Sequence, residues 1–250
     1  MTDVREFIRE LAAENAAFWQ DRDVRIDPAA PPAVRLEQIR YRMRQGVYNE
    51  LRSVELLAAW IPYTGEREIR ELLAGQLDDE HRHWQLLRRR LQALGEDPDA
   101  YRPLPEWEQL FDWLVACRTR PTLERLAMFQ FAGETQSCEG FETLITLARD
   151  VDPDTAEIYA SAILPDEYRH AAIGRRALTL LADTPEAQQV ARTACREMNE
   201  RIPAMKITEP YSPRPRAKAS TTPESAAGNS PGRITRQTVC ALPAPRLADA

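Results

Sequence analysis

Apolar residues recur at intervals of three and four through nearly the whole of residues 1–203. This spacing is typical of helices that bury one face. No stretch alternates apolar and polar residues as a half-buried strand would, and the chain contains only nine glycines in 250 residues. The pattern therefore predicts an all-α protein.

Prolines and glycines divide the pattern into four long helical segments. Pro31 and Pro32 open the first segment, Gly95 follows the second, and Pro121 opens the third. The four segments cover residues 32–60, 65–94, 121–150 and 154–182. At 1.5 Å per residue each is about 42 to 45 Å long. These proportions predict a four-helix bundle over residues 32–182.

Shorter elements flank and interrupt the four segments. Amphipathic patterns predict additional helices over residues 1–20 and 105–119, and Thr184 followed by Pro185 predicts the start of a last helix of about 18 residues. From residue 204 onward the composition shifts to Pro, Ser, Thr, Ala and Arg. We therefore expect a helical domain over residues 1–203 and a disordered tail over residues 204–250.

Each of the four long segments places one glutamate inside its apolar stripe. These residues are Glu50, Glu80, Glu134 and Glu167. A buried glutamate is costly unless it is paired or binds a metal. The stripes therefore predict that four carboxylates meet in the protein interior and need a partner there.

Two of these glutamates are followed by a histidine at the third position. Glu80-His-Arg-His83 lies in the second segment and Glu167-Tyr-Arg-His170 in the fourth. Because residues three apart share a helical face, each pair can bind one side of a metal ion. The competing interpretation, two surface contacts between neighbouring turns, is disfavoured by the apolar stripes around both glutamates.

One Glu on each of two helices and Glu-x-x-His on each of two others resembles the ligand set of the ferritin-like di-iron and di-manganese carboxylate proteins. The resemblance covers about residues 32–182. It implies that Glu50, Glu80 and His83 bind one metal, and that Glu134, Glu167 and His170 bind the other. It also implies two iron ions, with manganese or a mixed pair as alternatives, and bridging roles for Glu80 and Glu167.

Three further residues near these positions could join the site. His81 lies on a polar face, which favours exposure to solvent or indirect support of the ligands. Glu55 and Glu139 each follow a proposed ligand by five residues on a mixed face, so indirect roles are again favoured. Pro165 lies two residues before Glu167 and predicts a helical irregularity at the site.

The ferritin-like scaffold serves iron storage, peroxide reduction and oxidation of organic substrates. The chain is longer than storage ferritins and lacks the Cys-x-x-Cys pairs of a rubredoxin module. The resemblance therefore implies an enzyme, a non-haem di-iron oxygenase or oxidase. Its expected partners are dioxygen, a small organic substrate and an external electron donor such as a ferredoxin or reductase. The alternatives are an iron-binding ferroxidase and a metal-free interaction module.

The string Glu134-Thr-Gln-Ser-Cys138-Glu139-Gly-Phe141 is similar to the third-helix motif of the di-iron tRNA hydroxylases. The similarity implies that Cys138 borders the oxygen-binding pocket and keeps tRNA open as one substrate. A small apolar metabolite would suit the nearby aromatic residues equally well. These residues are Trp60, Trp84, Phe131 and Phe141.

Charge and composition indicate which partners and which cellular location to expect. Of the net charge of −6, residues 204–250 contribute seven basic and three acidic residues, so residues 1–203 carry about −10. This acidic body does not favour a nucleic-acid surface. No apolar run approaches the roughly 18 residues that a membrane span needs, and residues 1–10 lack a secretory pattern. We expect a cytoplasmic protein with free cysteines, and a homodimer is left open.

Overall fold

The computed structural model describes residues 3–20 and 29–202, and all regular structure in these ranges is helical. The prediction of an all-α protein is confirmed. The predicted tail over residues 204–250, including Cys240, lies outside the described residues.

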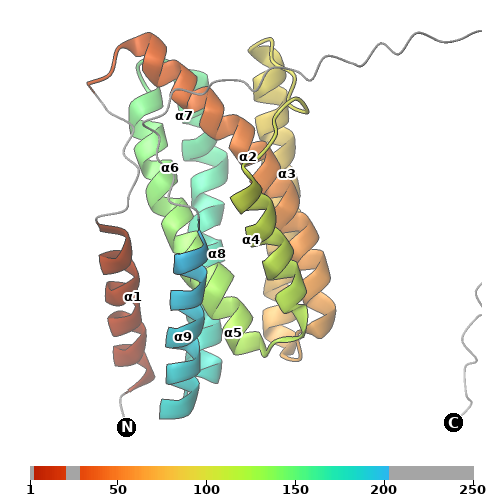
Figure 1. Ribbon diagram of the computed structural model, residues 1–250, viewed down its shortest axis with the longest axis vertical. Helices are drawn as coiled ribbons and strands as arrows, with labels where there is room; N and C mark the ends of the chain where they lie inside the picture. The colour runs from red at the N-terminus through yellow and green to blue at the C-terminus, as the bar shows by residue number, and fades with distance from the viewer. Residues whose placement is uncertain (1–2, 21–28, 203–250) are drawn as a thin grey trace, which may run out of the picture. The chain divides into compact units, whose positions relative to one another are not determined.

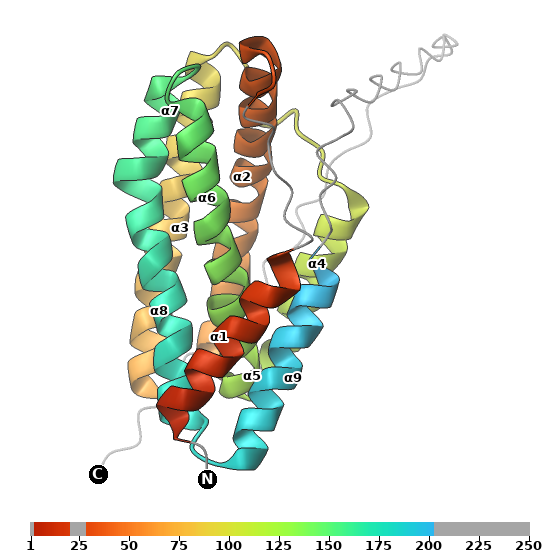
Figure 2. The same ribbon diagram turned by 90° about the vertical axis from the view of Figure 1, so that its left-hand side faces the viewer.

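Four long helical stretches lie side by side (Figures 1 and 2). The first two are α2 (Pro32–Trp60) and α3 (Arg67–Ala93), which pack closely and are joined through the 3-10 turn Ile61–Tyr63. The third consists of α5 (Thr122–Leu126), a π-helical stretch (Ala127–Gly133) and α6 (Glu134–Ala148). The fourth consists of α7 (Pro153–Ile158), a π-helical stretch (Tyr159–Ile163) and α8 (Leu164–Leu181).

A π-helical stretch interrupts each of the third and fourth long helical stretches, whereas the sequence predicted an irregularity only in the fourth. The irregularity expected at Pro165 takes the form of a wider helical turn that ends two residues earlier, at Ile163. Because proline has no N–H to donate, the helix must rearrange its hydrogen bonds nearby. The other stretch ends at Gly133, directly before Glu134. Such π-turns often occur at functional sites, and here each precedes a proposed ligand.

Three further α-helices in the described part of the chain pack against the long stretches. They are α1 (Val4–Gln20), α4 (Pro105–Ala116) and α9 (Pro185–Arg201). Figure 2 shows α1 beside α9. The contact between them includes hydrogen bonds from Trp19 Nε1 to Asn199 Oδ1 (3.2 Å) and from Asn199 Nδ2 to Asn15 Oδ1 (2.7 Å). As the sequence predicts, Thr184 caps α9, its hydroxyl accepting from the backbone N–H of Ala187.

The fully buried Arg125 ties the third long stretch to the end of α2. Its guanidinium donates to the carbonyl oxygens of Trp60 (3.1 Å), Tyr63 (2.9 Å) and Arg120 (3.0 Å). The last carbonyls of a helix have no partner within the helix. Arg125 therefore supplies a charged donor to backbone oxygens at and after the end of α2, and Thr64 Oγ1 also donates to the Trp60 carbonyl at 3.1 Å.

Replacing Arg125 with alanine is expected to lower the free energy of unfolding by about 3 kcal/mol, because three backbone carbonyls lose a charged donor and a fully buried side chain is removed. Urea denaturation followed by circular dichroism measures the change. Arg67→Ala is the control, since the Arg67 side chain is 91% exposed and forms a surface ion pair with Glu71. Its effect should stay within about 0.5 kcal/mol, and equal losses in the two variants would contradict the role of Arg125.

Candidate metal centre

The four glutamates predicted to share the interior are buried next to one another. Their exposed fractions are 5% for Glu50, 2% for Glu80, 4% for Glu134 and 3% for Glu167. They come from α2, α3, α6 and α8, one from each long stretch. The apolar stripes thus placed each carboxylate correctly with respect to the core.

Each of the two histidines points one ring nitrogen at these carboxylates. Nδ1 of His83 lies 3.5 Å from both Glu50 Oε2 and Glu167 Oε1. Nδ1 of His170 lies 3.4 Å from Glu80 Oε1 and 3.7 Å from Glu167 Oε1. Among the described residues neither Nδ1 atom has a hydrogen-bond partner, although both imidazoles are buried. Two ring nitrogens without a hydrogen-bond partner among the described residues therefore face a cluster of acidic oxygens.

The opposite ring nitrogens are held by two aspartates in a crossed arrangement. Nε2 of His83 on α3 lies 3.1 Å from Asp166 Oδ2 on α8. Nε2 of His170 on α8 lies 3.3 Å from Asp79 Oδ2 on α3. In metal sites, a carboxylate that accepts a hydrogen bond from one ring nitrogen fixes the orientation of the imidazole. It also leaves the other ring nitrogen available to bind the metal. Each histidine is thus oriented by the aspartate that precedes the glutamate of the partner helix.

Two arginines neutralise these aspartates. Arg82 donates to both Asp79 (2.7 Å) and Asp166, and Arg169 likewise pairs with both, at 3.1 Å from Asp79. Burial alone would raise the pKa values of Asp79 and Asp166, but Arg82 and the other nearby donors outweigh it, and both pKa values are lowered. The two aspartates therefore stay ionised beside the imidazoles.

Sequence reasoning missed the two aspartates and the two arginines. The signal was present, because residues 79–83 and 166–170 both read Asp-Glu-x-Arg-His. The apolar stripes pointed only to the Glu of each pentapeptide, and the His was added because it lies three residues later on the same helical face. The crossed contacts between Asp and His become visible only when α3 and α8 lie side by side.

A glutamine network, also missed, supports two of the carboxylates. Gln76 is buried and its Nε2 donates to Glu134 Oε1 (2.7 Å) and Glu80 Oε1 (2.9 Å). Its own Oε1 accepts from Gln130 Nε2 at 3.2 Å. The network links α3 to the π-helical stretch Ala127–Gly133 and fixes how the two carboxylates are oriented.

Like charges crowd the cluster. Burial, together with Glu50, Glu167 and Glu134, raises the pKa of Glu80 well above its usual range, and burial with Glu167 and Glu50 does the same for the pKa of Glu134. Burial opposes a charged imidazole, but Glu167 and Glu50 outweigh it and raise the pKa of His83 to about 11. The cluster thus attracts positive charge, which protons or a bound cation can supply.

The ligand atoms form two overlapping groups. One contains Glu50, Glu80, His83 and Glu167, and the other contains Glu80, Glu134 and His170, with all atoms of a group within 4.8 Å of one another. With metal–ligand bonds of 2.0 to 2.2 Å, opposite ligands of one ion lie about 4.4 Å apart. The residues could therefore hold two metal ions with Glu80 as a common ligand. The ligand atoms of each group are already close to the distances that one ion requires, so the side chains would need to move little.

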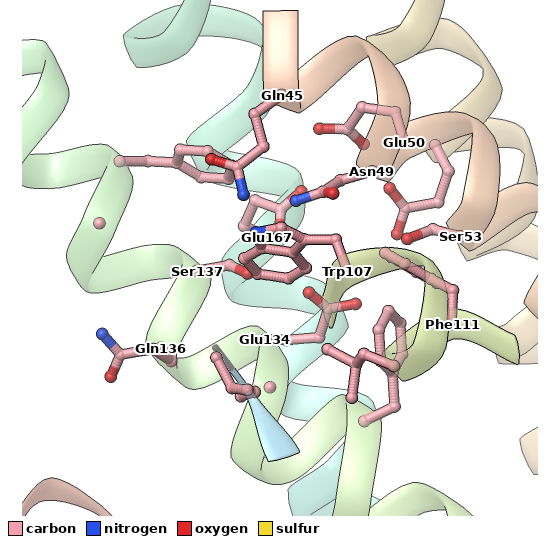
Figure 3. Close-up of a pocket in the computed structure, with 18 of the residues that line it drawn as sticks. Gln45, Asn49, Glu50, Ser53, Trp107, Phe111, Glu134, Gln136, Ser137 and Glu167 are labelled. Atoms are coloured by element: carbon pink, nitrogen blue, oxygen red, sulfur yellow. The ribbon is translucent and has the colours of Figure 1, made fainter. Parts of the chain in front are cut away.

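A cavity of about 190 Å³ adjoins the carboxylates (Figure 3). Glu50, Glu80, Glu134 and Glu167 line it on one side. Four of its apolar lining residues come from α4, which was predicted as a helix but not as part of the site. The large apolar lining residues are Trp19, Trp107, Leu110, Phe111, Leu114, Phe129, Phe141, Leu144, Met198 and Ile202.

The prediction for the aromatic residues near the site was wrong in part. Phe141 lines the cavity, whereas Trp60, Trp84 and Phe131 are not among its lining residues. Trp60 is instead fully buried and donates from Nε1 to the carbonyl oxygen of Leu114 at 2.9 Å. It fixes α4 against α2 and so supports the cavity wall indirectly.

Cys138 is buried beside the cluster, and burial with the nearby Glu167 and Glu134 raises the pKa of its thiol to about 12. It is not among the residues lining the cavity, where its neighbour Ser137 is found. Its role at an oxygen-binding pocket therefore stays a prediction. The same proximity makes Cys138 a neutral thiol at physiological pH.

The three residues left open as extra ligands lie outside both groups. His81 is exposed and stacks on Trp84 with ring centroids 5.6 Å apart. Glu55 is exposed and pairs with Arg52 at 3.3 Å, and Glu139 is exposed on α6. Their positions agree with the interpretation that they do not contact a metal directly.

Comparisons of the chain with protein families, with curated proteins and with solved structures find no match. Within residues 3–20 and 29–202, no helix combines the length and the apolar character that crossing a bilayer requires. The case for a function therefore rests on the geometry of the site.

Proposed function

We propose that the four long stretches form a ferritin-like four-helix bundle whose interior binds two iron ions. The observation that carries the proposal is the pair of buried imidazole nitrogens, Nδ1 of His83 and of His170, that face four buried carboxylates without a hydrogen-bond partner in the described part of the chain. Oxygen ligands with one imidazole per metal suit iron or manganese better than copper. Manganese or a mixed pair is the alternative metal content.

We further propose that the chain is a non-haem di-iron oxygenase or oxidase acting on a small organic substrate. When bound, the iron ions would supply the redox chemistry that activates dioxygen, with electrons from a separate ferredoxin or reductase. The support is the cavity, because it brings the same glutamates next to an apolar wall. A site serving only to oxidise and pass on iron has no need of an aromatic chamber.

The chain's own residues have distinct tasks in this proposal. Glu50, Glu80, His83, Glu134, Glu167 and His170 would hold the ions. Asp166 and Asp79 orient the two imidazoles through Nε2. Trp107 and Phe111 of α4 cover the chamber and limit the entry of water, which strengthens electrostatic interactions inside it.

The function is tested by loading the full chain with ferrous iron without oxygen, then adding oxygen and recording absorbance and oxygen consumption. The proposal predicts that about two irons per chain react and that further oxygen is consumed only when an electron donor is supplied. Continued oxidation of many irons per chain without a donor would instead identify a storage or ferroxidase protein and contradict an oxygenase.

The crossed aspartates give a sharper prediction about metal affinity. Asp79→Asn and Asp166→Asn are each expected to weaken ferrous binding by about 10- to 100-fold, because the ligand histidine loses its orienting carboxylate. Competition with a chelator of known affinity measures the effect. Asp78→Asn is the matched control, since Asp78 neighbours Asp79 but is exposed. Equal ferrous affinities for all three variants would contradict the role of Asp79 and Asp166 in orienting the metal ligands.

A further inference from the structure

The side of the cavity that α2 lines is polar. Two buried polar atoms on this side have no hydrogen-bond partner among the described residues. Gln45 is 2% exposed, and its Nε2 lacks an acceptor. Its Oε1 accepts from Arg42 Nη1 at 3.5 Å, which sets the amide so that the nitrogen is the free end. One turn later Asn49 Oδ1 is also unpaired. Figure 3 shows both side chains directed from α2 toward the indole of Trp107.

A second buried donor comes from the π-helical stretch Tyr159–Ile163. Tyr159 is completely buried, lines the cavity, and its hydroxyl has no partner in the described part of the chain. Gly46 makes room for it, because a Cβ atom there would lie 3.3 Å from the Tyr159 hydroxyl. The hydroxyl is therefore placed against α2 at the residue that follows Gln45.

Donors outnumber acceptors among these free atoms. Gln45 Nε2, Tyr159 O–H and Trp107 Nε1 can donate, whereas Asn49 Oδ1 is the one unpaired acceptor found among the described uncharged residues of the wall. Leaving buried donors unpaired is costly, so such atoms usually mark the place of a bound acceptor. The nearby glutamates disfavour an anionic ligand. A neutral carbonyl oxygen meets both conditions.

The size of the cavity limits the rest of the ligand. About 190 Å³ is below the roughly 300 Å³ at which pockets for larger ligands begin. It is somewhat more than the roughly 150 Å³ that accepts a benzene ring. The apolar wall, which includes Phe111, Leu114 and Phe129, suits the body of such a molecule.

We propose that the cavity binds a neutral, single-ring-sized carbonyl compound, of which a carboxamide is the best match. Its oxygen accepts from Gln45 and Tyr159, its N–H donates to Asn49, and its ring packs against α4. The inference rests on the proposed function only in calling this molecule the substrate, because the binding itself needs neither iron nor oxygen.

The test uses three fluorinated probes of matched size with the full chain kept metal-free by a chelator. Line broadening in fluorine NMR gives the dissociation constants of 4-fluorobenzamide, 4-fluorotoluene and 4-fluorobenzoate. We expect the amide to bind about tenfold more tightly than the toluene, as one or two net hydrogen bonds provide, and more tightly than the benzoate. Equal binding of amide and toluene would mean that water satisfies the donors, and would overturn the proposal.

Two kinds of variant locate the binding. Gln45→Leu and Tyr159→Phe should remove the preference for the amide while 4-fluorotoluene still binds, which shows that the fold and the cavity survive. Leu114→Trp should fill the cavity and abolish binding of both probes. Retained amide preference in Gln45→Leu and Tyr159→Phe, or unchanged binding in Leu114→Trp, would contradict the assignment. Since no iron is present, failure here leaves the iron stoichiometry intact as a separate test of the di-iron proposal.

Discussion

Replacing Glu80 with glutamine is expected to weaken ferrous binding by more than about 100-fold, since losing a shared ligand should cost more than losing an orienting neighbour. Glu80 is the residue that belongs to both ligand groups found among the described residues. The loss should therefore affect both ions. Competition with a chelator, performed anaerobically, measures the affinity.

The same substitution should leave the metal-free chain at least as stable as the native chain. Burial among Glu50, Glu134 and Glu167 raises the pKa of Glu80, so a neutral amide avoids the cost of either charging or protonating this carboxyl in the metal-free chain. Urea denaturation in the presence of a chelator tests this expectation. If Glu80→Gln instead destabilised the metal-free protein by several kcal/mol, the cluster would be a structural network of hydrogen bonds and not a metal site.

Glu55→Gln provides the control for the affinity measurement. Glu55 lies on α2 five residues after Glu50, and the sequence left it open as a ligand, but it is exposed and pairs with Arg52. Its substitution should leave ferrous affinity unchanged. A loss comparable to that of Glu80→Gln would contradict the assignment of ligands.

Gly174→Ala is expected to lower the free energy of unfolding by about 3 kcal/mol or more, the upper range for overpacking a core. A Cβ atom at Gly174 would lie 2.5 Å from Phe131 N and 2.7 Å from the carbonyl carbon of Gln130. Both are backbone atoms, so no side chain can move aside. The substitution forces α8 away from the π-helical stretch Ala127–Gly133, and the displacement should reach Glu134 directly after it.

Gly75→Ala is the matched control for Gly174→Ala. Gly75 also lies in a long helix, but a Cβ atom there would meet nothing within 4 Å. Alanine favours helix over glycine by up to about 1 kcal/mol, so this variant should be slightly more stable than the native chain. If Gly174→Ala were equally harmless, the close packing of α8 on the π-helical stretch would be wrong.

The sequence was sufficient to predict the helices and the buried glutamates, because both follow from local periodicity. The stripe around Glu50, for example, needs no knowledge of the other helices. The π-helical stretch Ala127–Gly133 could not be predicted, since nothing local indicates that α8 packs closely against residues 130 and 131 at Gly174. Pro165 indicated that a disturbance exists but not its form.

The cavity wall illustrates a second limit of sequence reasoning. Residues 105–119 were predicted to form an amphipathic helix, yet nothing local says where its apolar face docks. The hydrogen bond from Trp60 to the carbonyl of Leu114 joins residues 54 positions apart and fixes that position. The same holds for Asp79 and His170, whose contact spans 91 positions.

The number of ferrous ions bound per chain tests the central claim most directly. Equilibrium dialysis of the full chain against ferrous iron, without oxygen, should give about two ions per native chain. The His83→Ala and His170→Ala variants should each bind fewer. No more than trace binding by the native chain, with both variants indistinguishable from it, would contradict a metal centre at the four glutamates.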